Sequence, residues 1–249
     1  MESEAGVALI TGASRGLGAS IAVHLAKQGH PVAVNYQSSA EAARRVVEAI
    51  RGAGGMADAF AADVTDETQV SDLVNRVNQR LGPVDVLVVN ATGSQPEIRV
   101  EDLTWQEHLD QLVYFVKSPT LLVQAALPHM KARRHGRIIQ IGSDIFDRAL
   151  PGMSAYVAAK GAQLGLTRSW ARELGTHNIT VNLVAPGWVP VERHSEVAPS
   201  SYEEYVRDVP LRRFGQPADV AAAVAFLASE AAAFITGEQI SVNGGHTIH

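Results

Sequence analysis

The stretch VALITGASRGLG, residues 7–18, decides the fold of this chain. Its first four residues are apolar, which predicts a short buried strand. A glycine-rich turn follows and leads into residues 17–28, whose helical spacing ends before Gly29. A glycine turn between a strand and a helix lets the backbone approach a pyrophosphate, and the free N–H groups at the helix start attract the anion. The stretch therefore predicts a phosphate-binding turn, with a tight turn that binds nothing as the alternative.

The rest of the chain repeats this rhythm of short apolar runs and longer helical segments, which is typical of a parallel sheet covered on both faces. The predicted strands are residues 7–10, 32–35, 56–61, 84–89, 136–141, 180–184 and 239–242. We find no internal repeat and no dividing linker, so residues 1–249 are predicted to form a single domain. The expected fold class is α/β, a Rossmann-like three-layer sandwich with a parallel sheet of seven strands.

Two further segments carry specific expectations. In residues 70–81, apolar side chains recur with the period of one buried helix face, and Thr65 is the expected N-cap of that helix. Residues 188–216 interrupt the regular pattern with several prolines and aromatic residues. We interpret this stretch as a lid or a substrate loop.

Composition limits the function classes. The net charge is −5 and no long basic run occurs, which argues against nucleic-acid binding. The chain has no cysteine, which excludes disulfides and thiolate catalysis, and the spacing of its nine histidines does not indicate a metal site. The first residues lack the pattern of a secretory signal, and no apolar stretch is as long as a membrane helix. We expect a cytoplasmic protein that binds a small molecule rather than nucleic acid or a membrane.

Tyr156 and Lys160 are the first candidate catalytic pair. They are four residues apart, so on a helix both side chains leave the same face. A nearby ammonium group favours the phenolate and lowers the pKa of a tyrosine, which makes Tyr156 a candidate general acid or base. The same spacing also occurs on helix surfaces with no catalytic role. Ser143 supports the catalytic interpretation, because it follows a predicted strand and its hydroxyl can hydrogen-bond a substrate oxygen.

Together these features resemble the short-chain dehydrogenase/reductase family, and the resemblance covers essentially the whole chain. The glycine signature of the family is matched at Thr11, Gly12, Gly16 and Gly18. The other matches are Asp63-Val64 after the third strand, Asn90-Ala91 with Gly93 after the fourth, and Pro186-Gly187 with Val189 after the sixth. The motif after the fourth strand is only a partial match, because Val89 and Thr92 depart from it.

The resemblance implies an oxidoreductase that moves a hydride between a nicotinamide cofactor and a carbonyl/alcohol pair. Ser143 is then expected to orient the carbonyl and Tyr156 to transfer the proton, while Lys160 lowers the tyrosine pKa and binds the nicotinamide ribose. The implied cofactor-binding residues are Gly12, Ser14, Arg15, Gly16, Leu17, Gly18, Asn35, Tyr36, Ser38, Asp63, Val64, Asn90, Ala91, Gly93, Tyr156, Lys160, Pro186, Gly187 and Val189. Related chains of this size assemble with copies of themselves, so we expect a homotetramer, with a homodimer as the alternative.

The end of the second predicted strand favours NADP(H) over NAD(H). An acidic residue there would hydrogen-bond the adenosine ribose and repel a 2′-phosphate, but residues 35–39 contain no carboxylate. Arg15 in the glycine turn can bind that phosphate through its guanidinium. The alternative is that Arg15 is solvated and that Tyr36 simply stacks on adenine.

One feature of the family is missing from the sequence. The family commonly has an asparagine on its fourth helix, which helps hold a water chain that leads to the lysine. Motif comparison places Phe115 at that position, in a span about three residues longer than usual. Gln111 and Tyr114 are nearby polar residues, but neither matches the motif. Either the backbone carbonyl of Phe115 still binds the relay water, or the relay is broken and proton transfer is slow.

Other interpretations stay open at this point. A cofactor-binding regulatory protein with low activity could share the fold, since fold alone does not fix function. The short length and the serine, tyrosine and lysine spacing argue against a methyltransferase, and the lack of a large C-terminal substrate domain argues against a nucleotide-sugar epimerase. Asp144, Asp147 and Arg148 follow the candidate serine and either border a substrate pocket or form a surface charge pair.

Overall fold

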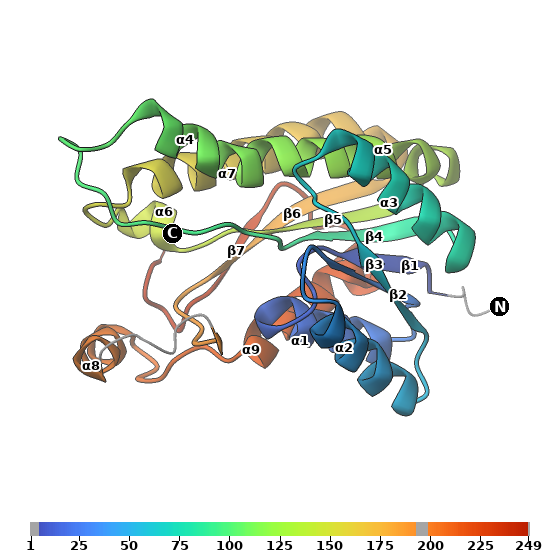
Figure 1. The fold of residues 1–249 in the computed structure, drawn as a ribbon, viewed down its shortest axis with the longest axis horizontal. Coiled ribbons are helices and arrows are strands. Elements are labelled where there is room, and N and C mark those ends of the chain that lie inside the picture. Colours follow the sequence, from blue (N-terminus) through green and yellow to red (C-terminus); the bar gives the residue numbers. More distant parts are fainter. Residues whose placement is uncertain (1–4, 193–198, 249) are drawn as a thin grey trace.

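The computed structural model describes residues 5–192 and 199–248. One parallel sheet has the strand order β3-β2-β1-β4-β5-β6-β7 (Figure 1). The strands are β1 (Val7–Ile10), β2 (Val32–Tyr36), β3 (Ala57–Ala61), β4 (Val84–Val89), β5 (Gly136–Ile141), β6 (Ile179–Pro186) and β7 (Gln239–Val242). The helices are α1 (Gly16–Lys27), α2 (Ala40–Gly52), α3 (Glu67–Arg80), α4 (Trp105–Leu112), α5 (Ser118–Arg133), α6 (Ile145–Arg148), α7 (Ser154–Leu174), α8 (Pro199–Asp208) and α9 (Pro217–Ala228). The predicted α/β fold class is confirmed.

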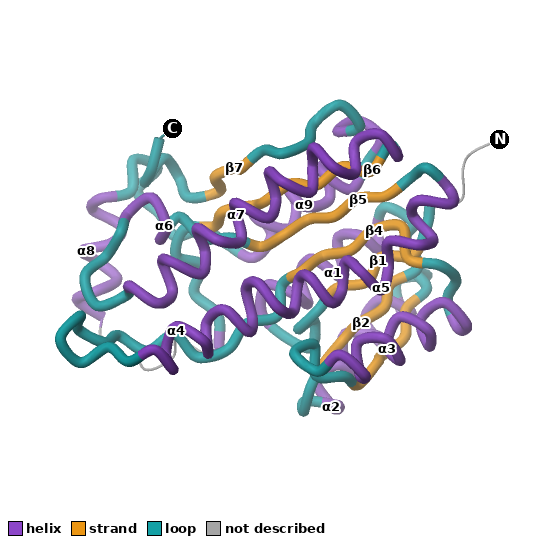
Figure 2. The backbone as a smooth tube through the Cα atoms, turned by 90° about the horizontal axis from the view of Figure 1, so that it is seen from above, coloured by secondary structure: helices purple, strands orange, loops and turns teal. Residues whose placement is uncertain are grey.

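The helices form two layers on opposite faces of the sheet (Figures 1 and 2). Helices α1, α2 and α9 pack on one face, and α3, α5 and α7 pack on the other. The strands supply both cores, because successive side chains point to opposite faces. Ala8 and Ile10 of β1 join the core under α1, whereas Val7 and Leu9 join the core under α3 and α5. Strands buried on both faces read as apolar runs, which explains why the sequence revealed them.

The strand order places a binding crevice at the centre of the sheet. Strand β1 pairs with β2 on one side and with β4 on the other, so the chain changes direction across the sheet at this point. In open parallel sheets, the loops that leave the carboxyl ends of the strands separate at such a point and form a crevice. The glycine turn after β1 and the loop after β4 therefore face the same crevice.

The structure corrects one local expectation and adds a helix to a second segment. Asp66, not Thr65, caps α3, because its side chain accepts a hydrogen bond from the Gln69 N–H. The Thr65 hydroxyl instead donates to Asp63. Within the stretch interpreted as a loop, residues 188–216, the structure contains α8, while residues 193–198 lie outside the described part. Among the described residues, no helix combines the length and apolarity needed to cross a membrane.

Candidate active site

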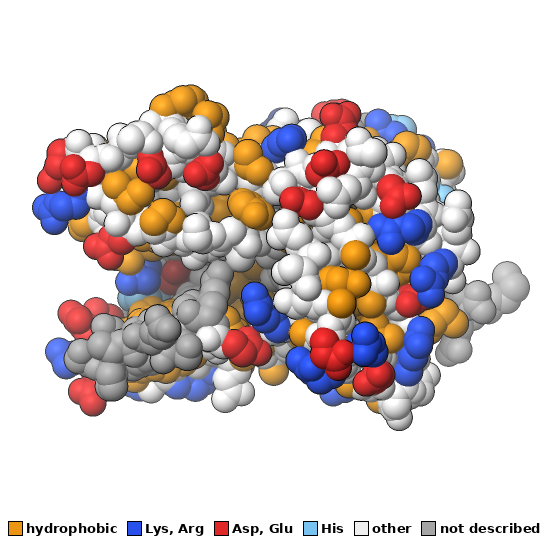
Figure 3. Space-filling model, viewed as in Figure 1, with side chains coloured by type: hydrophobic (Ala, Val, Ile, Leu, Met, Phe, Trp, Pro, Cys, Tyr) orange, Lys and Arg blue, Asp and Glu red, His pale blue; other side chains and the backbone are white. Residues whose placement is uncertain are grey.

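A cleft of about 540 Å³ opens at the carboxyl ends of the central strands. Figure 3 shows the same face hollowed between the part that carries α4 and the part that carries α8. The cleft brings together sixteen of the predicted site residues, namely Gly12, Ser14, Arg15, Gly16, Leu17, Gly18, Asn35, Tyr36, Ser38, Asp63, Val64, Asn90, Ala91, Gly93, Tyr156 and Lys160. These residues come from segments far apart in the sequence. The cleft therefore joins the glycine turn to the candidate catalytic pair.

The glycine turn has a backbone that only glycine adopts without strain. Gly12 and Gly16 have φ angles of 61° and 54°, in the left-handed region. A Cβ on Gly18 would lie 2.5 Å from the Gly12 carbonyl oxygen, so a side chain there would push the turn apart. Helix α1 begins at Gly16 with no acidic residue in its first turn and no capping side chain among the described residues. Its N–H groups are thus placed for an anion such as a pyrophosphate.

Thr11 and Asn90 fix this turn to the end of β4. The Thr11 hydroxyl oxygen accepts hydrogen bonds from the Asn90 N–H at 2.9 Å and the Ala91 N–H at 3.0 Å. The Asn90 amide donates to the Thr11 carbonyl oxygen at 2.8 Å and to the Gly12 carbonyl oxygen at 3.2 Å. Because both side chains bridge the two loops, the floor of the cleft is preorganised without a ligand.

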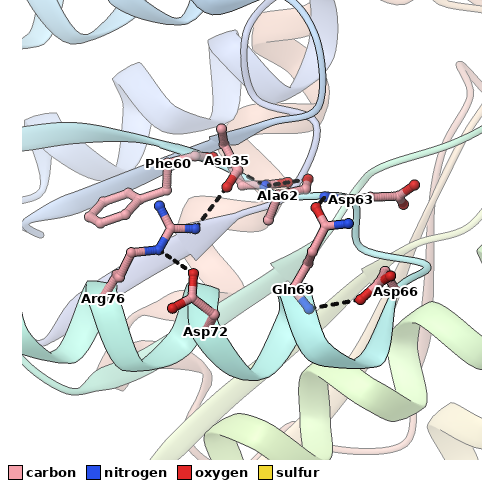
Figure 4. A network of polar contacts seen from close by, with 9 residues as sticks. Asn35, Phe60, Ala62, Asp63, Asp66, Gln69, Asp72 and Arg76 are labelled. Atoms are coloured by element: carbon pink, nitrogen blue, oxygen red, sulfur yellow. Dashed lines mark hydrogen bonds and ion pairs between the residues drawn. The ribbon is translucent and has the colours of Figure 1, made fainter.

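Asn35 supports the turn from the other side. Its side-chain oxygen accepts a hydrogen bond from the Gly12 N–H at 3.2 Å, and its amide nitrogen donates to the carbonyl oxygens of Phe60 and Ala62 (Figure 4). The side chain is almost fully buried. Asn35 borders the cleft, but its amide atoms are engaged with the protein, so its contribution is to join β2, β3 and the glycine turn.

Asp63 lies where β3 leaves the sheet, and its backbone N–H donates to the Gln69 side chain of α3 (Figure 4). Its carboxylate accepts hydrogen bonds from the Thr65 backbone, the Thr65 hydroxyl and the Gln37 amide. Burial acts to raise the pKa of Asp63, but these hydrogen bonds and the charge of Lys117 outweigh it and hold the pKa below its usual value. Asp63 is therefore a fixed acceptor at this edge of the cleft.

The catalytic end of the cleft holds Tyr156, Lys160 and Phe115. Lys160 is only 4% exposed, and its Nζ donates to the Ile141 carbonyl oxygen at 2.8 Å. The same nitrogen lies 3.8 Å from the centre of the Phe115 ring and 5.6 Å from the centre of the Tyr156 ring. The Phe115 and Tyr156 rings meet edge to face, with centres 5.4 Å apart. A tyrosine beside a buried ammonium group is the arrangement that proton transfer needs.

Four predicted site residues, Ser143, Pro186, Gly187 and Val189, are not among the residues that line the cleft. Ser143 follows Gly142, which does line it, and the Ser143 hydroxyl oxygen accepts a hydrogen bond from the Ile145 N–H at 3.2 Å. Pro186 ends β6, and the Gly187 N–H donates to the Val242 carbonyl oxygen. Val189 is buried. The structure thus places Ser143 next in sequence to a residue of the cleft and does not bring the other three into its lining.

The cleft also contains residues that the sequence analysis did not assign to the cofactor or to catalysis. They are Gln37, Ser39, Ala62, Thr92, Ser94, Gln95, Tyr114, Phe115, Ile141, Gly142, Val191 and Glu192. Half of them, Gln37, Ser39, Ala62, Thr92, Ile141 and Gly142, lie at the carboxyl end of a strand or within three residues after it, which is a usable signal in a parallel sheet. The others, Ser94, Gln95, Tyr114, Phe115, Val191 and Glu192, lie five or more residues beyond a strand, and their place in the cleft depends on how the chain returns to it.

A second polar cluster lies next to the cleft. Asp144 is 3% exposed, and one of its carboxylate oxygens lies 3.5 Å from Nδ1 of His246. Burial raises the pKa of Asp144 to about 6, with Asp147 adding to the increase and Arg148 opposing it. The Arg148 guanidinium lies over the Tyr205 ring, whose edge packs against His246. Asp144 is therefore a buried acid beside Ser143, not half of a surface charge pair.

Known proteins resemble the chain over nearly its whole length. The sequence model of the family described as enoyl-(acyl carrier protein) reductase matches residues 12–247. A protein of Staphylococcus aureus named 3-oxoacyl-(acyl-carrier-protein) reductase FabG is 42% identical over 240 residues, which cover 96% of each chain. A short-chain dehydrogenase/reductase from Serratia marcescens has a similar structure, with a TM-score of 0.91, 35% identity and coverage of 98% and 99% of the two chains. A blue fluorescent protein from a metagenomic library, solved in complex with NADPH, gives a TM-score of 0.90 at 37% identity and 98% coverage of both chains.

Proposed function

The chain belongs to the short-chain dehydrogenase/reductase family, and on that premise we propose that it is an NADP(H)-dependent oxidoreductase that interconverts a carbonyl and an alcohol on a small organic substrate. One observation carries the proposal. A single cleft has an uncapped, glycine-lined helix start at one end and Tyr156 beside the buried Lys160 at the other. Phosphate binding and proton transfer are thus available within one continuous site.

The lining of the cleft fits a dinucleotide. The backbone N–H groups at the start of α1 and the Ser14 side chain can hold a pyrophosphate, and Asp63 with Val64 can hold the adenine. Lys160 and the Asn90 loop can hold the nicotinamide half. When bound, the cofactor donates or accepts the hydride. The chain itself supplies binding, orientation and the proton.

Tyr156 is the proposed general acid for reduction and the general base for oxidation. Its phenol can donate a proton to the developing alkoxide, and the Lys160 charge favours the phenolate that remains. Ser143 is the proposed hydrogen-bond donor to the substrate oxygen. In the structure the Ser143 oxygen accepts a hydrogen bond from the Ile145 N–H, and the hydroxyl hydrogen remains to donate to the substrate oxygen.

The choice of NADP(H) rests on the charges around the adenosine end of the cleft. Arg15 lines the cleft, whereas residues 35–40 contain no carboxylate. The first acid after β2, Glu41, is paired with Arg44 at 2.6 Å and with Arg45 at 3.7 Å on its own helix. A 2′-phosphate would therefore meet cations rather than an unpaired acid. The similar metagenomic protein was solved with NADPH, which supports the same choice.

The substrate side of the site lies around residues 188–216. Trp188, Tyr205 and Phe214 pack together there, with ring centres 5.2–5.6 Å apart. We propose that this stretch, helix α8 included, forms the substrate loop of one domain that spans the chain. The S. aureus relative is named as a reductase of 3-oxoacyl groups. Thioesters of 3-oxo acids are therefore the first carbonyl compounds to test.

A second candidate function has one observation in its favour. Phe115, which motif comparison places where the family has asparagine, lies directly against the ammonium group of Lys160. If proton transfer depends on that asparagine, the chain binds NADP(H) but turns over slowly, as a regulatory protein would. Binding and turnover must therefore be measured separately.

The test titrates the protein with NADPH and with NADH and follows energy transfer from tryptophan to the reduced nicotinamide. The same protein is then mixed with 3-oxoacyl thioesters, ketones and quinones while the absorbance of reduced nicotinamide is recorded. We expect tighter binding of NADPH than of NADH and oxidation of NADPH by at least one carbonyl compound. Binding without turnover of any compound supports the regulatory alternative, and failure to bind either cofactor contradicts both.

A further inference from the structure

Lys160 has a contact that the family motifs do not account for. Its Nζ donates a hydrogen bond to the side-chain oxygen of Gln163 at 3.0 Å, besides the bond to the Ile141 carbonyl oxygen. Gln163 is 1% exposed, so its amide is as buried as the ammonium group it contacts. Both residues belong to α7, three positions apart, and side chains with that spacing lie on one face of a helix.

A buried ammonium group needs acceptors that do not cancel its charge. Removing a charge from water is costly, and each N–H that loses a water molecule needs a replacement acceptor. A carboxylate would satisfy the ammonium but would also neutralise its field at Tyr156. Gln163 and the Ile141 carbonyl are both neutral acceptors. They can hold the Lys160 charge without removing its effect on the phenol.

The rest of the chain holds the Gln163 backbone firmly in place. Its carbonyl oxygen accepts hydrogen bonds from the Thr167 hydroxyl at 3.0 Å and from the Gln140 amide at 3.4 Å. Gln140, on β5, also donates to the Thr167 hydroxyl oxygen at 2.8 Å. These three side chains are almost fully buried. The network joins α7 to the strand that ends at Ile141 through the Gln163 backbone carbonyl, and the Gln163 side-chain oxygen that contacts Lys160 takes no part in it.

The Phe115 ring also lies against the ammonium group of Lys160. With its ring centre 3.8 Å from Nζ, the aromatic face leaves no room for a water molecule between ring and ammonium group. A cation against an aromatic face is attracted to it, but the ring cannot accept a directed hydrogen bond as an amide does. Gln163 and the Ile141 carbonyl are therefore acceptors that give the Lys160 ammonium group a direction.

We propose that Gln163 is a positioning residue, whose amide oxygen holds the ammonium group of Lys160 in the place from which it acts on Tyr156. The inference rests on the proposed function, because it assigns Gln163 a part in the same reaction. Gln163 acts through Lys160 and contacts neither substrate nor the reacting atoms.

Two substitutions distinguish the role of Gln163 as a hydrogen-bond acceptor from its role in packing. Gln163→Met keeps an unbranched side chain of similar length and removes the strong acceptor. In this variant the ammonium group of Lys160 is held less well. We therefore expect phenolate formation at Tyr156 to move to higher pH and kcat to fall about tenfold. Gln163→Glu keeps an oxygen acceptor and adds a charge that opposes the phenolate. Phenolate formation then moves up by about one pH unit or more, even where the variant is as stable as the native chain.

Thr167→Val is the matched control. It removes a buried hydroxyl one helical turn after Gln163 and breaks hydrogen bonds to both Gln140 and the Gln163 carbonyl, but it does not touch Lys160. If this network only stabilises the fold, the Gln163 and Thr167 variants are expected to show the same changes in melting temperature and in the pH of phenolate formation. The proposal predicts that Thr167→Val lowers the melting temperature and leaves the pH of phenolate formation unchanged.

The experiment titrates the phenolate absorbance of the cofactor-free protein with pH. The chain has five tyrosines that contribute to this absorbance. The curve of the same protein carrying Tyr156→Phe is therefore subtracted from each curve, which leaves the contribution of Tyr156. Higher midpoints in both Gln163 variants, with no change in Thr167→Val, are the expected result. Midpoints that coincide with the native value in both Gln163 variants overturn the proposal.

The kinetic measurement distinguishes failure of this proposal from failure of the proposed function. If the native chain oxidises NADPH with a carbonyl compound and Gln163→Met does so with equal kcat and KM, only the role of Gln163 is wrong. If the native chain turns over no compound, the proposed function fails, while the titration still reports whether Gln163 acts on Tyr156 through Lys160.

Discussion

Arg15 is the residue that most clearly separates the two nicotinamide cofactors. It is exposed, it immediately precedes α1, and it lines the cleft near Ser38. We expect Arg15→Ala to weaken NADPH binding by about tenfold or more, because a charge-assisted hydrogen bond to the 2′-phosphate is lost. NADH has no such phosphate and serves as the control within the same variant. Equal weakening of both cofactors in fluorescence titrations contradicts the assignment.

Asp144 makes stability depend on pH in an unusual direction. Burial raises the pKa of Asp144 from 3.8 to about 6 in the folded protein. Below pH 3.8 the Asp144 carboxyl is protonated in both the folded and the unfolded chain, so Asp144 causes no loss of stability. As the pH rises from 3.8 to about 6, Asp144 loses its proton in the unfolded chain before it does so in the folded chain. The free energy of unfolding therefore falls by about 3 kcal/mol over this range. Above about pH 6 this loss of stability no longer changes with pH.

Asp144→Asn removes this loss while keeping the shape of the side chain. We expect the variant to be more stable than the native chain at about pH 8, with the difference shrinking as pH falls towards about 4. Asp147→Asn, in the short helix that Asp144 precedes, is the control and is expected to show a smaller trend, because Asp147 only adds to an increase in the Asp144 pKa that burial causes. Chemical denaturation at several pH values provides the comparison. A stability difference that does not vary with pH would show that Asp144 has no raised pKa.

At the scale of elements, the π-helical turn Val113–Lys117, which joins α4 to α5, sets the place of Phe115. Phe115 is 2% exposed and packs against both Tyr156 and Lys160. We expect Phe115→Asn to lower the free energy of unfolding by about 3 kcal/mol or more and to leave kcat at or below the native value.

Phe115→Leu is the matched variant, because it keeps the core apolar without an aromatic face. Melting temperature and kcat are measured for both variants. A large gain in kcat with asparagine would show that the proton relay is impaired in the native chain. The account predicts no gain, since Ile141 and Gln163 already bind the ammonium group of Lys160.

The strands were predictable because burial on both faces leaves an apolar run in the sequence. Their ends were less so: β6 continues to Pro186, where the expected strand stopped at residue 184, because pairing with β7 extends it. Helix α8 was missed, since prolines and aromatic residues obscured a helical segment whose Tyr205 packs against Trp188 and Phe214. Such contacts between distant segments leave no local pattern.

The site was predictable where backbone conformation demands a residue type. Gly12, Gly16 and Gly18 are examples, since only glycine suits the turn. Asn35 was expected to contact the cofactor, and its position at the end of β2 is as expected, but the bonds that engage its amide come from β3 and the turn. Gln163 gave no signal, because one glutamine on a helix face resembles any other buried polar residue.

The whole molecule exposes apolar side chains on both helix layers. Trp105 of α4 is 67% exposed, Phe226 of α9 is 43% exposed, and Phe234 after α9 is fully exposed. We take these side chains as candidates for surfaces that other chains cover. We propose a homotetramer and expect light scattering after size exclusion to give four times the 26.5 kDa mass of one chain. Phe234→Ser is expected to weaken the assembly, and a native mass of one chain contradicts the proposal.

The central claim is that one cleft binds NADPH and transfers a proton through Tyr156. The most direct test compares the native chain with Tyr156→Phe, which keeps the ring beside Phe115 and removes only the hydroxyl. NADPH affinity is measured by fluorescence and NADPH oxidation by absorbance, with the best carbonyl substrate of the native chain. The account predicts nearly unchanged affinity and a loss of turnover of about 10²-fold or more. Turnover that survives the substitution would show that Tyr156 is not the proton donor and would contradict the account.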